Sequence, residues 1–574
     1  MKNISEKTKK NIEIAMMIVL AVMAVIVSVK SVLVDFGFDD AYSVAMSYRH
    51  LSGDRLFLEM WEPHQTSIFV IDLLMLVYSI FVPSFEGASI YLNICGTLLF
   101  AGLAFFFYKE AKDVCDRFVA FAAALFLFVY RIKATVLPEF ANLSVFFSVL
   151  TLLLLVRFLK NNEKIIWLVS ASLSFCLWVL AYPACAIGYA GVLLILVLFS
   201  KNKVRNALVM TGVCAVTGGI YVLFFALRIG IKKFYHIIKF IIHGDTHITE
   251  YTGESGKIYR MITGSYFTDF LKVSMYAVII LAVLLLIKLL VHFIFKKDIK
   301  ILPVFSILLF LADTVVLIIW KMGRLPVWRN FWHISPVILV LIAVVFYKKA
   351  QSDQKRFWIM GLILSSVTMI AGIIFSDMYL AYITPYLVLG GAVSFILIAE
   401  SRYGKVAIAA FLLLALSRRM FYAGGYSQAD GHHTVLTMDT AAVTGYGPNK
   451  GLRTDTSTAA KENAAYSEFG QNLSENDKAF YAGMIKIDYI IDPVCMIMMD
   501  CEISNPSTID TPIYNDVLNS YYEINPDKYP TVIVLDAVGS EEEMVSDPYI
   551  VGWMAEQGFT EVSYGQYYRF YRKP

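Results

Sequence analysis

The stretch IEIAMMIVLAVMAVIVSVKSVLV at residues 12–34, followed by FGFDDAYSVAMSYRHLSGD at residues 36–54, decides the fold. The first part is apolar and long enough to cross a hydrocarbon core of about 30 Å as a helix. Four lysines precede it within the first ten residues, so the positive-inside rule places the N-terminus in the cytoplasm. The second part therefore emerges on the exterior face, where it presents two adjacent carboxylates, Asp39 and Asp40.

The composition indicates a membrane protein. The chain has 574 residues, of which 58% are hydrophobic and 17% are charged, and these values exclude an ordinary soluble enzyme. Apolar runs similar to the first one recur as far as about residue 424. The net charge of +3 is too small to suggest a nucleic-acid partner, and no glycine-rich phosphate loop stands out. We therefore expect a polytopic membrane protein with a polar tail.

One apolar run does not fit a complete crossing. SIFVIDLLMLVYSIFV at residues 67–82 is only about 16 residues long and carries Asp72 near its middle, where a charge is costly in hydrocarbon. If this run is an interfacial or re-entrant helix, every cytoplasmic connection carries lysine or arginine. The crossings are then predicted at 12–34, 88–107, 117–135, 141–158, 165–182, 184–200, 207–227, 272–295, 301–320, 331–347, 357–376, 379–400 and 406–424.

The predicted fold class is an all-α polytopic membrane domain of about 13 transmembrane helices with a small exterior α/β domain after it. The membrane domain is expected at 1–424, with exterior loops at 35–88, 131–140 and 228–271, and the exterior soluble domain at 425–574. In this tail PTVIVLDA, YYRFYRK and KIDYIIDP are typical of strands, and TSTAAKENAAYSEFGQNL, TPIYNDVLNSYYEI and DPYIVGWMAEQGF are typical of helices. Cys495 and Cys501 could form a disulfide there or stay reduced.

Basic residues collect in the exterior loops, where they oppose the positive-inside trend and therefore suggest a bound anion. The segment KKFYHIIKFIIH at residues 232–243 places charged and apolar residues at near-helical intervals and predicts an amphipathic helix at the lipid surface. Its lysines could be attracted to anionic head groups or could bind a specific lipid phosphate, and the sequence leaves both open. The candidates for lipid-phosphate binding are Lys232, Lys233, Arg260, Arg324 and Arg329.

Three short motifs occur in an order and spacing that are typical of a known family. FDDAYSVAMSYRHLSGD has an acid pair, a tyrosine shortly after it and a Gly-Asp about fifteen residues on. WEPHQTSIF brings a proline to the start of a juxtamembrane helix, and LPEF follows in the second exterior loop. In these motifs the chain resembles the GT-C superfamily of membrane glycosyltransferases, most closely the bacterial aminoarabinose transferases of lipid A and the protein O-mannosyltransferases.

The resemblance implies an inverting glycosyltransferase that takes a sugar from a polyprenyl-phosphate donor on the exterior face. It implies that Asp39 is the catalytic base, with Asp40 and Glu139 as further catalytic residues, although the family has an aspartate at the position of Glu139. Some relatives bind a divalent metal, and surface histidines without a metal are the alternative here. The candidates for substrate contact are Tyr42 and His64, and those for metal ligation are Glu62, His243 and His247.

Other interpretations stay open at this stage. FDDAYSVAMSYRHL could simply begin a helix, with Asp39 as N-cap and Asp40 favoured by the helix dipole. A transporter or flippase of lipid-linked sugars would use charges inside helices, such as Asp313 and Lys288, and a polysaccharide polymerase or ligase would also use a lipid-linked sugar. For the transferase, we expect membrane lipids, the lipid-linked donor and a glycan, lipid or protein acceptor as partners. We expect it in the plasma membrane, with the N-terminus cytoplasmic and the C-terminal domain exterior.

Overall fold

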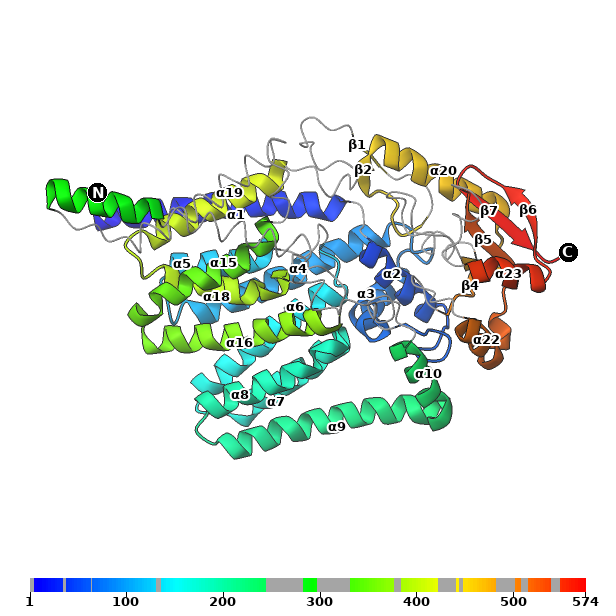
Figure 1. Cartoon of the computed structure of the whole chain (residues 1–574), viewed down its shortest axis with the longest axis horizontal. Coiled ribbons are helices and arrows are strands. Elements are labelled where there is room, and N and C mark those ends of the chain that lie inside the picture. Colours follow the sequence, from blue (N-terminus) through cyan, green and yellow to red (C-terminus); the bar gives the residue numbers. More distant parts are fainter. Residues whose placement is uncertain are drawn as a thin grey trace.

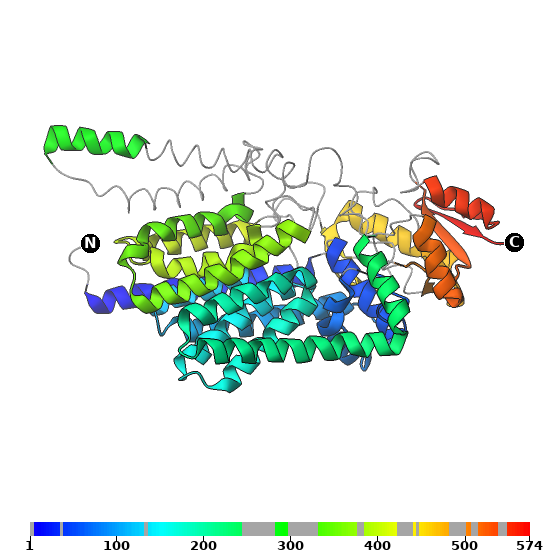
Figure 2. The same ribbon diagram turned by 60° about the horizontal axis from the view of Figure 1, so that its bottom comes forward.

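The protein is mostly helical, with apolar helices followed by a small C-terminal sheet (Figure 1). The computed structural model describes residues 5–34, 38–62, 64–130, 136–243, 282–296, 331–375, 384–421, 440–442, 447–481, 501–506, 515–537 and 548–574. In two views the helices run side by side along the long axis of the molecule, and the sheet lies at one end of them (Figures 1 and 2).

The helices of this bundle include five that are long and apolar enough to cross a membrane, namely α1, α4, α6, α9 and α16. Shorter apolar helices pack among them, so the described residues support several crossings without fixing the predicted number of about thirteen. The helices are α1 (Glu6–Leu33), α4 (Ala88–Ala111), α5 (Arg117–Val129), α6 (Phe140–Lys160), α7 (Ile165–Ala181), α8 (Gly188–Phe199), α9 (Lys203–Ile229), α15 (Phe331–Phe346), α16 (Ser352–Phe375), α18 (Val388–Ile398) and α19 (Gly404–Phe421), with a further helix at 282–295.

Burial separates the inner helices from those that face lipid. In the most apolar window of α6, 78% of the residues are buried, whereas in α9 only 6% are. The exposed side chains of α9 are themselves apolar, for example Val222, Phe224 and Leu227. A long apolar surface is unfavourable in water. Its exposure on α9 therefore indicates that this helix lies against the acyl chains of lipids.

Three short elements connect the first crossing to α4. They are α2 (Phe38–Leu51), the 3₁₀ turn η1 (Gln65–Ile68) and α3 (Phe69–Ser79). At 1.5 Å per residue, the 11 residues of α3 extend about 16 Å, roughly half of a hydrocarbon core. This length agrees with the expectation that residues 67–82 do not make a complete crossing.

The C-terminal unit, by which we mean the described residues from 447 onward, contains a five-stranded sheet in the order β4-β3-β5-β7-β6. Strands β4, β3 and β5 are parallel, and β7 pairs antiparallel with β5 and β6. The predicted strands PTVIVLDA and YYRFYRK form β5 and β7, whereas KIDYIIDP and Cys495 lie outside the described residues. The elements are β2 (Arg453–Asp455), α20 (Thr456–Asn472), β3 (Lys478–Tyr481), β4 (Glu502–Ile503), α22 (Asn515–Ile524), β5 (Val532–Asp536), α23 (Pro548–Glu556), β6 (Thr560–Tyr564) and β7 (Tyr568–Arg572), and β1 (Thr440–Ala442) pairs with β2.

The loop between the first crossing and α4 lies between the bundle and the sheet. One apolar cluster joins Ala41 and Val44 of α2 to Phe469 of α20 and Phe570 of β7. A second cluster joins the loop residues 57–61 to α22, α23 and α10 (Ile231–His243). Because both clusters bury residues from distant parts of the chain, the C-terminal unit and this first loop form one packed region.

Candidate functional site

Helix α2 carries the acid pair at its first turn. The helix begins at Phe38, so Asp39 is already inside the helix and is not its N-cap, which corrects the capping alternative. The structure describes the backbone of Asp39 and not its side chain. The side chain of Asp40 is buried, with 1% exposure. An acid in the first helical turn is favoured by the helix dipole, and this stabilises the ionised form that a base requires.

Further along α2, two side chains meet the carboxylate of Glu62. The hydroxyl of Tyr42 donates a hydrogen bond to Glu62 Oε2 at 3.0 Å, and Arg49 Nη1 lies 3.7 Å from Glu62 Oε1. All three residues are buried. Tyr42 and Glu62, predicted to contact substrate and metal respectively, are therefore brought together, and Arg49 joins them as a residue that the sequence did not single out.

The second loop reaches the same region where Phe140 meets His64 of the first loop. The imidazole of His64 stacks on the ring of Phe140, with centroids 4.2 Å apart and planes 3° apart, and it meets Tyr42 edge-on at 6.5 Å. Phe140 follows Glu139, whose carboxylate accepts hydrogen bonds from the backbone N–H groups of Ala141 at 2.7 Å and Asn142 at 2.8 Å. Glu139 thus caps α6, and its predicted catalytic role stays a prediction.

A glycine lets the second loop approach α4 closely. A Cβ on Gly96 would lie 1.8 Å from the backbone oxygen of Val136, far inside van der Waals contact. Any larger residue would push residues 136–139 away from α4, so Gly96 fixes the depth at which Glu139 sits.

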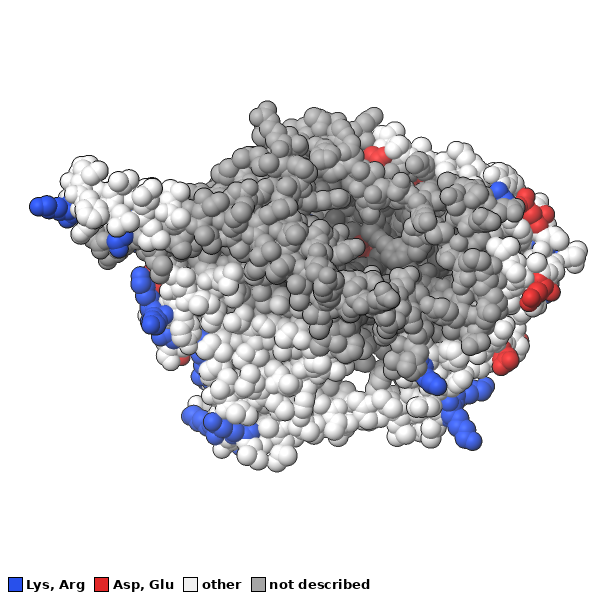
Figure 3. All heavy atoms as spheres, viewed as in Figure 1, with Lys and Arg blue, Asp and Glu red and all other residues white. Residues whose placement is uncertain are grey.

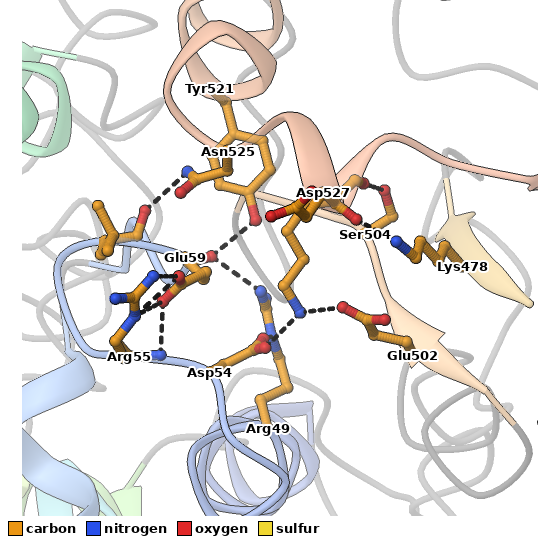
Figure 4. A network of polar contacts seen from close by, with 12 residues as sticks. Arg49, Asp54, Arg55, Glu59, Lys478, Glu502, Ser504, Tyr521, Asn525 and Asp527 are labelled. Carbon is orange, nitrogen blue, oxygen red and sulfur yellow. Dashed lines mark hydrogen bonds and ion pairs between the residues drawn. The ribbon is translucent and has the colours of Figure 1, made fainter. Parts of the chain in front are cut away.

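Arg49 also connects this cluster to the C-terminal unit, as Figure 4 shows. Its Nε donates to Asp54 Oδ2 at 2.8 Å and its Nη2 donates to the carbonyl of Glu59 at 3.0 Å. Asp54 also pairs with Lys528, which lies 2.5 Å from Glu502 Oε1. Burial opposes the charge on Arg49, but the carboxylates of Asp54 and Glu62 outweigh it and the pKa of Arg49 is raised.

A polar cavity opens beside this network. Its volume is about 440 Å³, and its lining includes Arg49, Ser52, Asp54, Glu502 and Lys528. Its wall carries both donors and acceptors, which suits a hydroxyl-rich ligand better than an apolar one. Arg49 lines the cavity and also lies 3.7 Å from Glu62.

The predicted basic residues are not part of this cluster where the structure describes them. Lys232 and Lys233 are exposed on α10, and the side chain of His243 lies outside the described residues. His247, Arg260, Arg324 and Arg329 also lie outside them, as does Asp313. In the part of the chain that is described, no three His, Cys, Asp or Glu side chains cluster as a metal site would require.

Sequence reasoning found the acids of the first loop and missed the residues that hold them. Arg49 follows a tyrosine within an otherwise ordinary helix, and Lys528 is 474 residues away from its partner Asp54. A basic residue on the core-facing side of α2 was the one signal available, because charges are seldom buried without a partner.

Comparison with solved structures finds chains that are similar to this one, and an oligosaccharyltransferase and ArnT are among them. The oligosaccharyltransferase of Archaeoglobus fulgidus, in complex with Zn and sulfate, is 14% identical and has a TM-score of 0.44, over 90% of this chain and 68% of that one. ArnT from Cupriavidus metallidurans in the apo state is 10% identical, with a TM-score of 0.43, over 97% of each chain. ArnT bound to undecaprenyl phosphate is 12% identical, with a TM-score of 0.41, over 96% of each.

Both proteins are GT-C glycosyltransferases, the superfamily that the sequence motifs resemble. No protein-family model and no curated protein match the sequence. Because the identities and TM-scores are low, we derive a function from the residues of this chain.

Proposed function

We propose that the protein is an inverting glycosyltransferase that moves a sugar from a polyprenyl-phosphate donor to an acceptor at the exterior membrane face. The observation that carries this proposal is the buried polar cluster of Tyr42, Glu62 and Arg49 on the helix that begins with Asp39 and Asp40. It lies where the apolar bundle ends and the C-terminal unit begins. A lipid-linked sugar has an apolar chain and a polar head, and such a boundary accommodates both.

The proposed reaction needs one ionised carboxylate and one stabilised leaving group. Asp39 takes the proton from an acceptor hydroxyl, and the acceptor oxygen attacks the anomeric carbon as the bond from that carbon to the phosphate oxygen breaks. The configuration inverts, and the polyprenyl phosphate leaves with one more negative charge. We assign the stabilisation of this charge to Arg260, Arg324 and Arg329, since cations placed where charge develops lower the barrier most.

The residues around Asp39 would orient the two substrates. We propose that Asp40, which is buried, and Glu139, which caps α6, contribute to the same site. Tyr42 and His64 would contact the sugar, and we propose that the acceptor enters through the 440 Å³ cavity beside Arg49. The carboxylate of Glu62 faces the Tyr42 hydroxyl and the Arg49 guanidinium, and this pairing fits a metal ligand poorly.

The orientation in the membrane follows from the distribution of charge. Lysines and arginines lie at the end of the bundle that is remote from the sheet, and a second group lies near the sheet end, at the position of α10 (Figure 3). Basic loops remain in the cytoplasm, so we propose that the C-terminal unit and the site are exterior.

The proposal is tested with the purified full chain in nanodiscs, a polyprenyl-phosphate sugar as donor, and water or a small alcohol as the acceptor whose hydroxyl takes the sugar. The expected product is free polyprenyl phosphate, and Asp39→Asn should lower its release by about 10²- to 10⁴-fold, the usual contribution of a general base. Asp113→Asn is the matched control, because Asp113 pairs with Lys160 at the opposite end of the bundle. Wild-type release in folded Asp39→Asn protein would remove Asp39 from the role of base. Transbilayer movement of intact donor would support a transporter instead.

A further inference from the structure

Helix α10 presents basic side chains on one side and apolar side chains on the other. Lys232, Lys233 and Lys239 are exposed, whereas Ile237 is completely buried. The helix follows α9 after Gly230, whose φ of +96° allows the sharp change of direction seen at the end of α9 in Figure 1.

The apolar side of α10 packs on protein. The ring of Phe240 stacks on Trp61 at 5.4 Å, and Phe234 meets Phe57 edge-on, also at 5.4 Å. Phe57 and Trp61 belong to the first loop, directly before Glu62. This aromatic layer separates the lysines from the Tyr42–Glu62 pair, so the lysines are poorly placed to hold the phosphate of a donor bound there.

The outer side of α10 has the composition of a membrane-interface surface. Beside the lysines, the apolar side chains of Ile231 and Tyr235 are 67% and 71% exposed. They continue the exposed apolar surface of α9, where Leu227 is 68% exposed, and Arg228 marks the junction. Tyrosine and lysine next to an apolar stripe are typical of the level of the lipid head groups.

We propose that the outer side of α10 binds the anionic head groups of bilayer phospholipids and thereby holds α10 against the first loop. The phosphate charge complements Lys232, Lys233 and Lys239, while Ile231 and Tyr235 enter the acyl boundary. Each lysine near an anionic surface favours binding by roughly fivefold. Since the opposite side of α10 covers Phe57 and Trp61, the bilayer composition controls how firmly the loop that precedes Glu62 is held.

Hydrogen exchange of the full chain in nanodiscs tests this proposal without any catalytic assay. Nanodiscs of phosphatidylcholine alone are compared with nanodiscs that also contain phosphatidylglycerol. We expect slower exchange of α10 amides with phosphatidylglycerol, and we expect salt to weaken the effect because it screens exposed charges. In the double variant Lys232→Gln with Lys233→Gln, the protection that phosphatidylglycerol gives to the α10 amides should fall about 30-fold. The corresponding arginine variants should keep this protection.

The matched control is a pair of exposed lysines that are consecutive in the sequence, Lys348 and Lys349, between α15 and α16. Gln at both of these positions should leave the protection of α10 unchanged. Equal exchange in the two bilayers would overturn the proposal, as would an equal loss in the control pair. Protection by polyprenyl phosphate in a neutral bilayer, without an effect of phosphatidylglycerol, would also overturn it and assign the lysines to the donor.

Discussion

Replacing Arg49 by Met should loosen the contact between the C-terminal unit and the first loop. Met keeps much of the volume of the side chain and removes its charge and all its donors. The substitution would break the hydrogen bonds to Asp54 and to the Glu59 carbonyl, and it would remove a cation that lies 3.7 Å from Glu62. Tyr521 donates to the same Glu59 carbonyl at 2.9 Å, so that part of the junction would lose one of two donors.

The magnitude follows from the burial of the partners. Arg49 is 2% exposed and Asp54 is 8% exposed, so water cannot replace the lost interactions without opening the junction. Removing one member of a buried ion pair costs about 3–5 kcal/mol. Asp54 keeps Lys528 as a partner, which favours the lower end of that range. The equilibrium constant for local opening should therefore rise by roughly 10²- to 10³-fold.

Arg55 provides the matched control. It pairs with Glu59 in the same loop, but its side chain is 53% exposed. Exposed ion pairs contribute about 0.2–1 kcal/mol, so Arg55→Met should change the opening constant by only a few fold. Hydrogen exchange in α22 and in the Pro526–Lys528 turn reports the opening directly. Equal exchange rates in the two variants would refute the assignment of Arg49 as the residue that joins the two parts.

Two further substitutions test the supports of the site. Gly96→Ala should destabilise the protein by about 1–3 kcal/mol and lower the rate of sugar transfer, because the new methyl group would meet the Val136 carbonyl. Thermal unfolding measures the destabilisation. The control is Gly102→Ala on the same helix, where the new methyl group meets open space. The hydrogen bond to Asp72 raises the pKa of His50, so the pair stabilises the protein below about pH 6.5 and this stability is lost as the pH rises through the raised pKa. Melting temperatures between about pH 6 and 9 should fall with pH in the wild type and change little in Asp72→Asn.

The sequence predicts much of the architecture because the length of an apolar run depends on neighbouring residues alone. An apolar run such as residues 12–34 needs no distant partner to be assigned as a crossing, and the short length of residues 67–82 together with Asp72 identifies that run as exceptional. The strands β5 and β7 were predictable for the same reason, since their alternation is visible within a few residues.

The contacts of the site could not be predicted in the same way. The hydrogen bond from Tyr42 to Glu62 joins residues that are 20 apart, and its existence depends on how the loop after α2 folds back. The pattern of α10 likewise reveals an apolar side but not its partner, which proves to be Phe57 and Trp61 rather than lipid. Periodicity specifies a surface, and only tertiary packing specifies what covers it.

The hydrogen bonds of the first loop indicate that the C-terminal unit completes the site. The backbone directly before Glu62 has three of its polar groups paired with that unit: the carbonyls of Leu58 and Glu59 accept from Asn525 and Tyr521, and the N–H of Trp61 donates to the Pro506 carbonyl at 2.9 Å. Without the C-terminal unit the Trp61 N–H would lose its acceptor, and the carbonyls of Leu58 and Glu59 would each keep one donor, from Trp61 Nε1 and Arg49 Nη2. Buried backbone groups need partners, so this segment would loosen. The carboxylate of Glu62 would then lose the geometry that places it against Tyr42. For this reason a chain truncated before residue 447 should insert into the membrane and yet lack a formed site.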